Sequence, residues 1–228
     1  MEMPILYEDA DILAVNKPAG VMTHPDGKST AETAADWFLQ KYPEGGYAHR
    51  LDRDTSGVLV FAKNPDALVF LKKVFHAREA KKVYLAFIYG VPKERKGVID
   101  FDIGRSRKDF RLRSAQPKAR GTLREAITRY EVVSDIGTHA LLKVEPETGR
   151  THQIRVHLKA IHHPIVCDKL YAPKHPCNLG FIRLGLHAYA LDIPLSSDGR
   201  TNIVAPIPGD FLSALARFEG GNIVFSAS

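Results

Sequence analysis

The feature that most constrains the fold is an apolar run preceded directly by a dense polar segment. Residues Val58–Ala62 are all apolar, as in a strand that is buried on both faces of a sheet. The segment before it, His49–Gly57, carries four charged side chains together with histidine, threonine and serine. Polar groups at the mouth of a buried strand must be hydrogen-bonded or functional. From these residues alone, the simplest interpretation is a turn at Asp54 and Thr55, with Gly57 supplying a flexible φ.

Around this run, the hydrophobic patterns predict more strands than helices. Strands are expected over residues 5–7, 12–15, 58–62, 83–89, 127–133, 140–144, 186–193 and 202–205. Helices are expected after a capping box at Ser29–Glu32, after Asn64-Pro65, and after Thr148 or Thr151. Because the two kinds of element do not alternate regularly, we predict an α+β fold. Its central β-sheet would be mixed and largely antiparallel, flanked by helices and loops.

Composition narrows the class of protein. The chain has 228 residues, of which 44% are hydrophobic and 25% charged, which excludes a collagen, a disulfide scaffold, a long coiled coil and a mostly disordered chain. No apolar run approaches the ~20 residues that a membrane span needs. The N-terminus lacks the basic region of a secretory signal, and two cysteines make no disulfide framework. We therefore predict one cytoplasmic domain over residues 1–228, most simply a monomer.

Positive charge is concentrated in two stretches. Lys plus Arg is 32 and Asp plus Glu is 26, a net charge of +6. Between Gly104 and Arg129, nine residues are basic and two acidic; Lys72, Lys73, Arg78, Lys81 and Lys82 form a second group. Either stretch alone could be a solvated face. Together, and close to aromatic residues, they favour a surface that binds the phosphates of a nucleic acid.

The usual cofactor motifs are missing. Gly27–Thr30 resembles the end of a phosphate-binding loop, but the position that needs its first glycine is Met22. No G-x-G-x-x-G or G-x-S-x-G sequence occurs, and the histidines and cysteines after His162 have no zinc-site spacing. We therefore predict no nucleotide cofactor and no metal.

A second polar segment, Glu147–His157, begins a predicted helix. In it, Arg155 lies near the first turns beside His152 and Gln153. A guanidinium there could hold a carboxylate or phosphate through two hydrogen bonds. A surface ion pair with a nearby acid explains the residue equally well.

These segments, taken in order, resemble the RluA-type family of RNA pseudouridine synthases. His49-Arg50-Leu51-Asp52 followed by Thr55-Ser56-Gly57 looks like the family signature. Further similar segments, in family order, are residues 9–20, 81–86, 149–157, 163–165, 168–171 and 186–188. The resemblance covers about residues 5 to 206. An ordered set of this kind is far more specific than any single motif.

The resemblance implies isomerisation of uridine to pseudouridine in RNA without a cofactor, in a cleft across the sheet. Asp52 would be the essential carboxylate, as covalent nucleophile or as stabiliser of an activated sugar. Asp54 is its nearest rival. Arg155 would pair with Asp52, and Tyr84 would stack on the uracil and help to remove its C5 proton.

The resemblance also implies an RNA-binding surface. The uridine must leave the RNA stack, and Arg50 would occupy the gap. His49 and Thr55 would contact the substrate, and Arg111 and Arg113 in the basic segment 104–120 would hold the RNA backbone. Lys17 and His187 are weaker candidates. No separate N-terminal RNA-binding domain is expected.

Three classes of function can be considered for a chain with these residues. The first is the isomerase, acting on ribosomal or transfer RNA. The second is an RNA-binding or RNA-folding module on the same scaffold. The third, an unrelated aspartate-dependent hydrolase, would need metal ligands or a second paired carboxylate that the sequence does not offer.

Overall fold

The chain forms two compact units that each combine a sheet with helices. This computed structural model describes residues 2–25, 27, 29–106, 112–115 and 120–218. The first unit contains the residues up to Lys82 and His187–Pro206, and the second contains Val83–Leu186 and the residues from Ile207. Both combine helices with mainly antiparallel strands, so the predicted α+β class is confirmed. The single domain over 1–228 stays a prediction.

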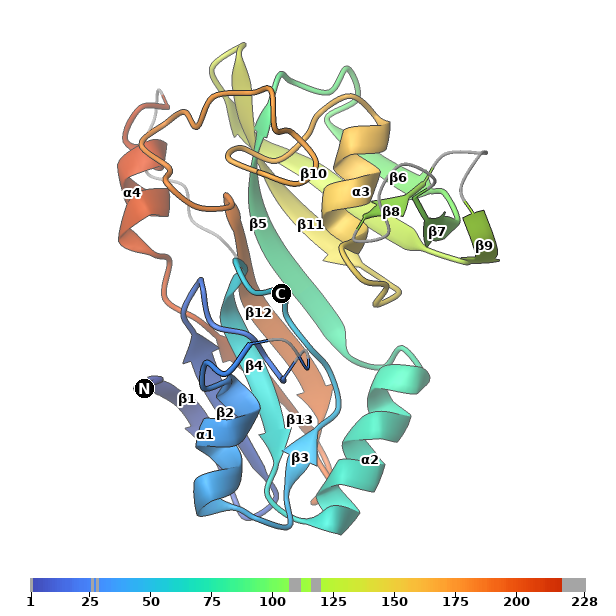
Figure 1. The fold of residues 1–228 in the computed structure, drawn as a ribbon, viewed down its shortest axis with the longest axis vertical. Helices are drawn as coiled ribbons and strands as arrows, with labels where there is room; N and C mark the ends of the chain where they lie inside the picture. Colours follow the sequence, from blue (N-terminus) through green and yellow to red (C-terminus); the bar gives the residue numbers. More distant parts are fainter. Residues whose placement is uncertain (1, 26, 28, 107–111, 116–119, 219–228) are drawn as a thin grey trace. The chain divides into compact units, whose positions relative to one another are not determined.

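The first unit is a sheet with two helices (Figure 1). In spatial order its strands are β1 (Ile5–Glu8), β2 (Ile12–Lys17), β4 (Ser56–Ala62) and β12 (Leu186–Pro194); β13 (Arg200–Val204) pairs with β12 and β3 (Gly46–Tyr47) with β4. Its helices are α1 (Ala34–Lys41) and α2 (Pro65–His76). Every residue of β4 is buried, as the apolar run predicts.

The helix α2 forms where its capping residues predict. Asn64 accepts a hydrogen bond from Ala67 N at 2.8 Å, and Pro65 opens the first turn. Leu71 and Val74 then pack into the core with the β4 side chains. Because the cap and the apolar stripe agree, local sequence suffices to place this helix.

The start of α1 differs from the prediction. The capping box is Thr33 with Asp36, not Ser29 with Glu32. Thr33 Oγ1 accepts from Asp36 N at 3.2 Å, and Asp36 Oδ2 accepts from Thr33 N at 2.9 Å. Ser29 has the same spacing to an acid, but its hydroxyl accepts from Ala31 N instead. Two successive candidate boxes were present, at residues 29–32 and 33–36, and the helix uses the second.

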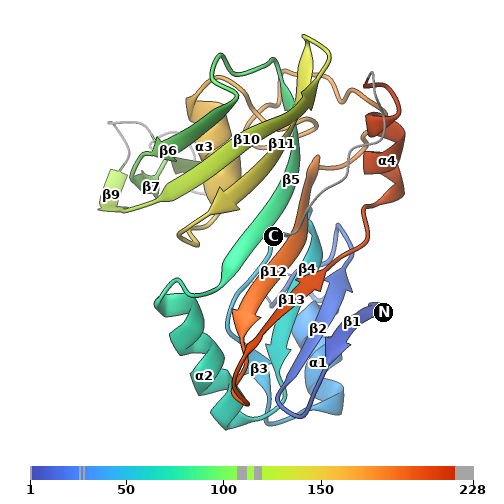
Figure 2. The ribbon, with the colours of Figure 1, turned by 180° about the vertical axis from the view of Figure 1, so that it is seen from behind.

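The second unit has a larger and a smaller sheet. The larger runs β5 (Lys81–Tyr89), β11 (His139–Pro146), β10 (Ile127–Asp135), β6 (Lys96–Asp100), and the smaller β8 (Arg113–Ser114), β7 (Ile103–Arg105), β9 (Arg120–Arg124). Helix α3 (Gln153–Ala160) covers one face of β10 and β11, as Figures 1 and 2 show from opposite sides. Its Ile154 and Leu158 pack against the core of the larger sheet.

Three features of the second unit were not predicted. The basic segment, expected as a hairpin or loop, contributes the three strands of the smaller sheet in its described part. Helix α4 (Gly209–Leu215) had no sequence signal, and its Phe211 packs edge-on to Phe87. Helix α3 begins at Gln153 rather than at Thr148 or Thr151, because His152 has a left-handed backbone with φ 57°.

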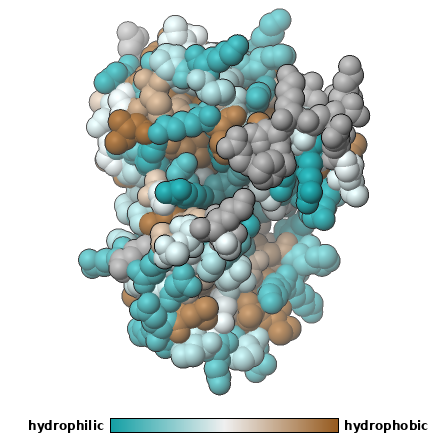
Figure 3. Space-filling view, viewed as in Figure 1, coloured by the Kyte–Doolittle hydropathy of each residue, from teal (hydrophilic) through white to brown (hydrophobic). Residues whose placement is uncertain are grey.

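The longest helix in the described part of the chain, α2, has 12 residues. No helix in this part of the chain is both long and apolar enough to cross a bilayer. Hydrophilic and neutral side chains cover most of the face seen in Figure 3, and apolar side chains form separate patches.

Gly57 allows β4 and β12 to meet where the polar segment ends. The two strands run parallel there, with Ser56 opposite His187 and Gly57 opposite Ala188. Gly57 has φ +115°, and a Cβ on it would lie 2.1 Å from the Ala188 carbonyl oxygen. A side chain would therefore collide with backbone, which cannot move aside as a flexible side chain can. The close approach requires glycine at this position.

Replacing Gly57 by alanine should destabilise the fold strongly. We expect Gly57→Ala to lower the free energy of unfolding by about 3–5 kcal/mol, from the left-handed φ and the backbone clash together. Gly199→Ala is the matched control, with φ +85° in open space, and should cost only about 1–2 kcal/mol. Urea unfolding of both variants measures the difference. Equal losses would show that the approach to Ala188 imposes no constraint.

Candidate active site

Asp52 lies on a turn that a buried lysine holds in place. Lys17 is fully buried, and its ammonium donates to the carbonyls of Pro18, Val21 and Arg53 at 2.9, 2.8 and 3.1 Å. These three bonds use the three N–H donors of an ammonium group. Lys17 therefore ties the loop after β2 to the turn that carries Asp52. These bonds give Lys17, a weaker candidate for the site, a structural role.

Two further contacts join the same loop to the turn. Gly20 N donates to Arg53 O at 2.9 Å, and Arg53 Nε returns a bond to Gly20 O at 3.1 Å. Thr23 Oγ1 donates to Leu51 O at 2.9 Å and accepts from Leu51 N at 3.1 Å. The residues on both sides of Asp52 are thus fixed through their backbone, which leaves the half-buried Asp52 on a rigid turn.

His49 faces the interior of the first unit. Its Nε2 accepts from Val60 N at 2.9 Å, and its ring stacks on Phe75 with centroids 4.5 Å apart. Burial, with a smaller effect of the Lys82 charge, lowers the pKa of His49 to about 3. The ring is therefore neutral and serves β4 and α2. These contacts give His49 a structural role, and its expected contact with the substrate stays a prediction.

The other expected residues of the first unit differ in exposure. Arg50 is exposed, and its Nη1 lies 2.7 Å from Nε2 of His24. Thr55 is buried, and its Oγ1 has no hydrogen-bond partner among the described residues. His187 is also buried, with Nδ1 2.9 Å from Ser56 Oγ. The polar segment thus leaves Arg50 exposed and Asp52 half-buried and keeps Thr55 inside, and His187 of β12 is buried as well.

In the second unit, Arg155 forms a buried pair with Asp168. Its Nε and Nη2 donate to the two carboxylate oxygens at 2.8 Å each, and both side chains are almost fully buried. Asp168 Oδ1 also accepts from the backbone N of Leu170 and Tyr171, both at 3.0 Å. The Tyr171 ring lies 5.0 Å from the guanidinium carbon. The guanidinium is thus fixed in both plane and direction.

Asp168 is the residue that sequence reasoning missed. The segment 168–171 was matched to the family, but no role was assigned to it. The charge of Asp168 and its place after a His-Pro-Ile stretch were the available signals. The pairing of Arg155 with Asp52 stays a prediction.

Tyr171 extends this arrangement to the smaller sheet. Its hydroxyl accepts from Arg113 N at 2.9 Å and lies 2.8 Å from His152 Nδ1. His152 holds its left-handed backbone at this contact, a conformation that surrounding structure must impose on a non-glycine residue. Arg113 is thereby placed near the start of α3, whereas Arg111 lies outside the described residues.

Tyr84 lies on β5 of the second unit. It is opposite Val144 of β11 and half-buried, packed against the core of the larger sheet. Its expected stacking on the uracil of the substrate stays a prediction.

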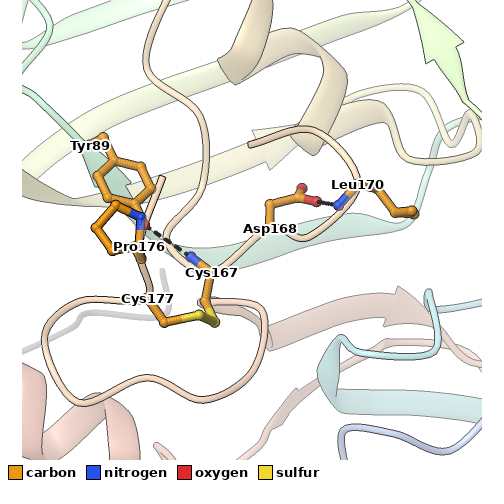
Figure 4. Close-up of a disulfide and its surroundings, with 6 residues drawn as sticks. All are labelled: Tyr89, Cys167, Asp168, Leu170, Pro176 and Cys177. Atoms are coloured by element: carbon orange, nitrogen blue, oxygen red, sulfur yellow. Dashed lines mark hydrogen bonds between the residues drawn. A yellow bond between two sulfur atoms is a disulfide. The ribbon is translucent and has the colours of Figure 1, made fainter. Parts of the chain in front are cut away.

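The two cysteines are paired, which their number and spacing do not predict. Cys167 and Cys177 form a disulfide with their Cα atoms 4.5 Å apart. Figure 4 shows it beside Tyr89, whose hydroxyl donates to the Pro176 carbonyl and accepts from Cys167 N. Asp168 follows Cys167 directly, so the bridged loop carries the acid that holds Arg155.

Within the described ranges, no group of three or more metal-ligating side chains occurs.

The sequence and the fold both match known proteins. The family described as RNA pseudouridylate synthase matches residues 11–160. An uncharacterized RNA pseudouridine synthase of Synechocystis is 37% identical, over 92% of this chain and 67% of that protein. Ribosomal large subunit pseudouridine synthase D of Borreliella burgdorferi is 34% identical, over 94% and 68%. The chain thus spans about two thirds of the length of these relatives.

A solved structure supports the same likeness. The human RNA pseudouridylate synthase domain containing 4 protein has a TM-score of 0.78 and 28% identity, covering 94% of this chain and 93% of that one.

The neutral His49 should make stability fall in mild acid. Its folded pKa of about 3 lies below the unfolded value of 6.5, so the unfolded chain binds a proton that the folded chain excludes as pH falls below 6.5. Between pH 7 and 5 this costs about 2 kcal/mol. The variant His49→Gln keeps an acceptor for Val60 N without titrating. Urea unfolding at both pH values should show a loss smaller by that amount in the variant; equal losses would contradict the assignment.

Removing the partner of Arg155 should also destabilise the chain. We expect Asp168→Ala to lower the free energy of unfolding by about 3–5 kcal/mol, because the buried guanidinium loses an ion pair and two hydrogen bonds. The control is Glu131→Ala, which breaks the exposed Lys96–Glu131 pair and should cost less than about 1 kcal/mol. Denaturant unfolding compares the two. A small loss for Asp168→Ala would show that Arg155 is stabilised by other contacts.

Proposed function

This chain belongs to the RNA pseudouridylate synthase family and, as an RNA pseudouridine synthase, isomerises uridine in RNA; we propose that Asp52 is the carboxylate on which its reaction depends. The supporting observation is the turn itself. Lys17 and Thr23 fix the backbone on both sides of Asp52. A catalytic side chain needs such a rigid support to keep its geometry.

The chemistry requires a carboxylate at the sugar and a base for one proton. The bond between N1 and the ribose C1′ breaks, the uracil turns, and C5 bonds to C1′. C5 then loses its hydrogen and N1 gains one, so the reaction is redox-neutral. Asp52 acts either by bonding covalently or by stabilising the activated sugar. Both routes place its oxygens against the extruded nucleoside.

Arg155 is proposed to aim at Asp52 and to keep it ionised. Its fork with Asp168 uses two of the five N–H groups of a guanidinium, and the group has the capacity to serve a second carboxylate. Asp168 would then be a positioning residue, acting through Arg155. Tyr84 would stack on the uracil and present its hydroxyl near C5.

The RNA is proposed to be distorted and held by basic side chains. Extruding the uridine costs a few kcal/mol. The exposed Arg50, two residues before Asp52, would occupy the vacated space. Arg113, fixed by Tyr171, would help the basic segment 104–120 to hold phosphates. Thr55 and His187 would support the substrate pocket from inside the first unit.

The first RNA to test is that of the large ribosomal subunit. Two relatives, from Borreliella burgdorferi and Neisseria meningitidis, are named ribosomal large subunit pseudouridine synthase D. Transfer RNA is the alternative target. A cytoplasmic monomer stays our prediction.

Substitution of Asp52 should abolish isomerisation. Total RNA from cells lacking this protein, labelled with [5-³H]uridine, releases tritium when C5 bonds to the sugar. We expect Asp52→Asn to slow this release by at least about 10³-fold. Asp54→Asn, which alters the adjacent exposed carboxylate, should stay within about threefold of the unsubstituted chain. Activity in Asp52→Asn would refute the proposal, and RNA binding without any release by the unsubstituted chain would favour an RNA-binding module.

A further inference from the structure

We propose that His24, Tyr47 and Arg50 form a stacking platform for an unpaired RNA nucleobase that neighbours the uridine bound at Asp52. The inference rests on the proposed function of Asp52 and adds a second binding site to it. The ligand class is a nucleobase of any type, held by its face rather than by its hydrogen-bonding edge.

The rings of His24 and Tyr47 form a nearly parallel pair. Their centroids are 5.3 Å apart, and their planes differ by 8°. Tyr47 is 38% exposed, His24 is half-buried and Arg50 is exposed. A tyrosine that contributes only to a core would not leave this much of its side chain in water. The pair therefore offers an aromatic face at the surface of the first unit.

Hydrogen bonds fix the orientation and the tautomer of the histidine ring. Arg50 Nη1 lies 2.7 Å from Nε2, and the Pro25 carbonyl lies 2.9 Å from Nδ1. A guanidinium can only donate and a carbonyl can only accept. Nε2 is therefore the acceptor and Nδ1 carries the hydrogen. The positive charge of Arg50 lies at the Nε2 edge of the ring.

Both supports of the platform are rigid. The loop that carries His24 is held by the two hydrogen bonds between Thr23 and Leu51. Tyr47 lies on β3, paired with Phe61 of β4, and the neighbouring Gly46 packs so closely that a Cβ would lie 2.8 Å from Leu68 Cδ2. The backbone that carries each ring is therefore tied to the core of the first unit. The platform is thus formed before any ligand arrives, which reduces the entropic cost of binding.

The same contacts place the platform beside Asp52. Thr23 binds Leu51, the residue directly before Asp52, and Arg50 precedes Leu51. The exposed Arg53 lies just beyond Asp52, so arginines flank the carboxylate on both sides. Arginines attract phosphates, while exposed aromatic rings and guanidinium planes stack on unpaired bases. An RNA strand that delivers one nucleotide to Asp52 leaves its neighbour next to such a surface.

Variants of Tyr47 separate stacking from packing. Tyr47→Leu keeps apolar bulk but removes the aromatic face, whereas Tyr47→Phe keeps the face. With the tritium-release assay under single-turnover conditions, we expect Tyr47→Leu to raise the half-saturating protein concentration roughly 5- to 100-fold. The maximal rate should change less than threefold, and Tyr47→Phe should match the unsubstituted chain. An unchanged half-saturating concentration in Tyr47→Leu would overturn the platform.

Photochemical crosslinking tests the platform without relying on a folded variant. The full unsubstituted chain is irradiated at 254 nm with the same total RNA, and crosslinked peptides are mapped by mass spectrometry. Nucleotides attached to His24 or Tyr47 support the proposal, and attachment only at other residues overturns it.

The two proposals fail in different ways. If Asp52→Asn retains activity, the proposed catalytic role fails, whatever Tyr47→Leu does. If activity depends on Asp52 while Tyr47→Leu behaves normally and no crosslink maps to the platform, only the further inference fails.

Discussion

A single buried ammonium group fixes the turn on which the proposed chemistry depends. Burying a charge is costly unless it is fully compensated, and Lys17 is compensated by three backbone carbonyls from two segments far apart in sequence. Because every donor is used, the two segments are fixed relative to each other. Asp52 and the platform at His24 and Tyr47 both depend on this junction. A basic residue near the site therefore acts on backbone rather than on substrate.

The second unit solves the same problem with opposite charges. Arg155 is held by Asp168, and Asp168 is held by the backbone of the bridged loop that begins at Cys167. The Tyr171 ring lies against the guanidinium, and its hydroxyl connects it to the smaller sheet. In both units a buried ion is held by more partners than one ion pair supplies. Such full coordination lets a charged group be both buried and precisely directed.

Much of the fold was predictable because local and tertiary signals agreed. The apolar run of β4 and the Asn64 cap of α2 each had a clear local cause. Prediction failed where two local solutions competed, as at Thr33 in α1, or where tertiary contacts forced an unusual backbone, as at His152 before α3. Helix α4 had no local signal, because packing around Phe87 rather than capping defines it.

The sequence by itself determined the class of chemistry, because an ordered set of short motifs fixes which side chains are available and on which turns they lie. It could not assign their partners. Whether His49 faces the core, whether Arg155 has a second acid, and whether His24 meets Tyr47 depend on contacts between segments distant along the chain. Those contacts arise only when strands pair in register and helices pack, so only the tertiary structure decided them.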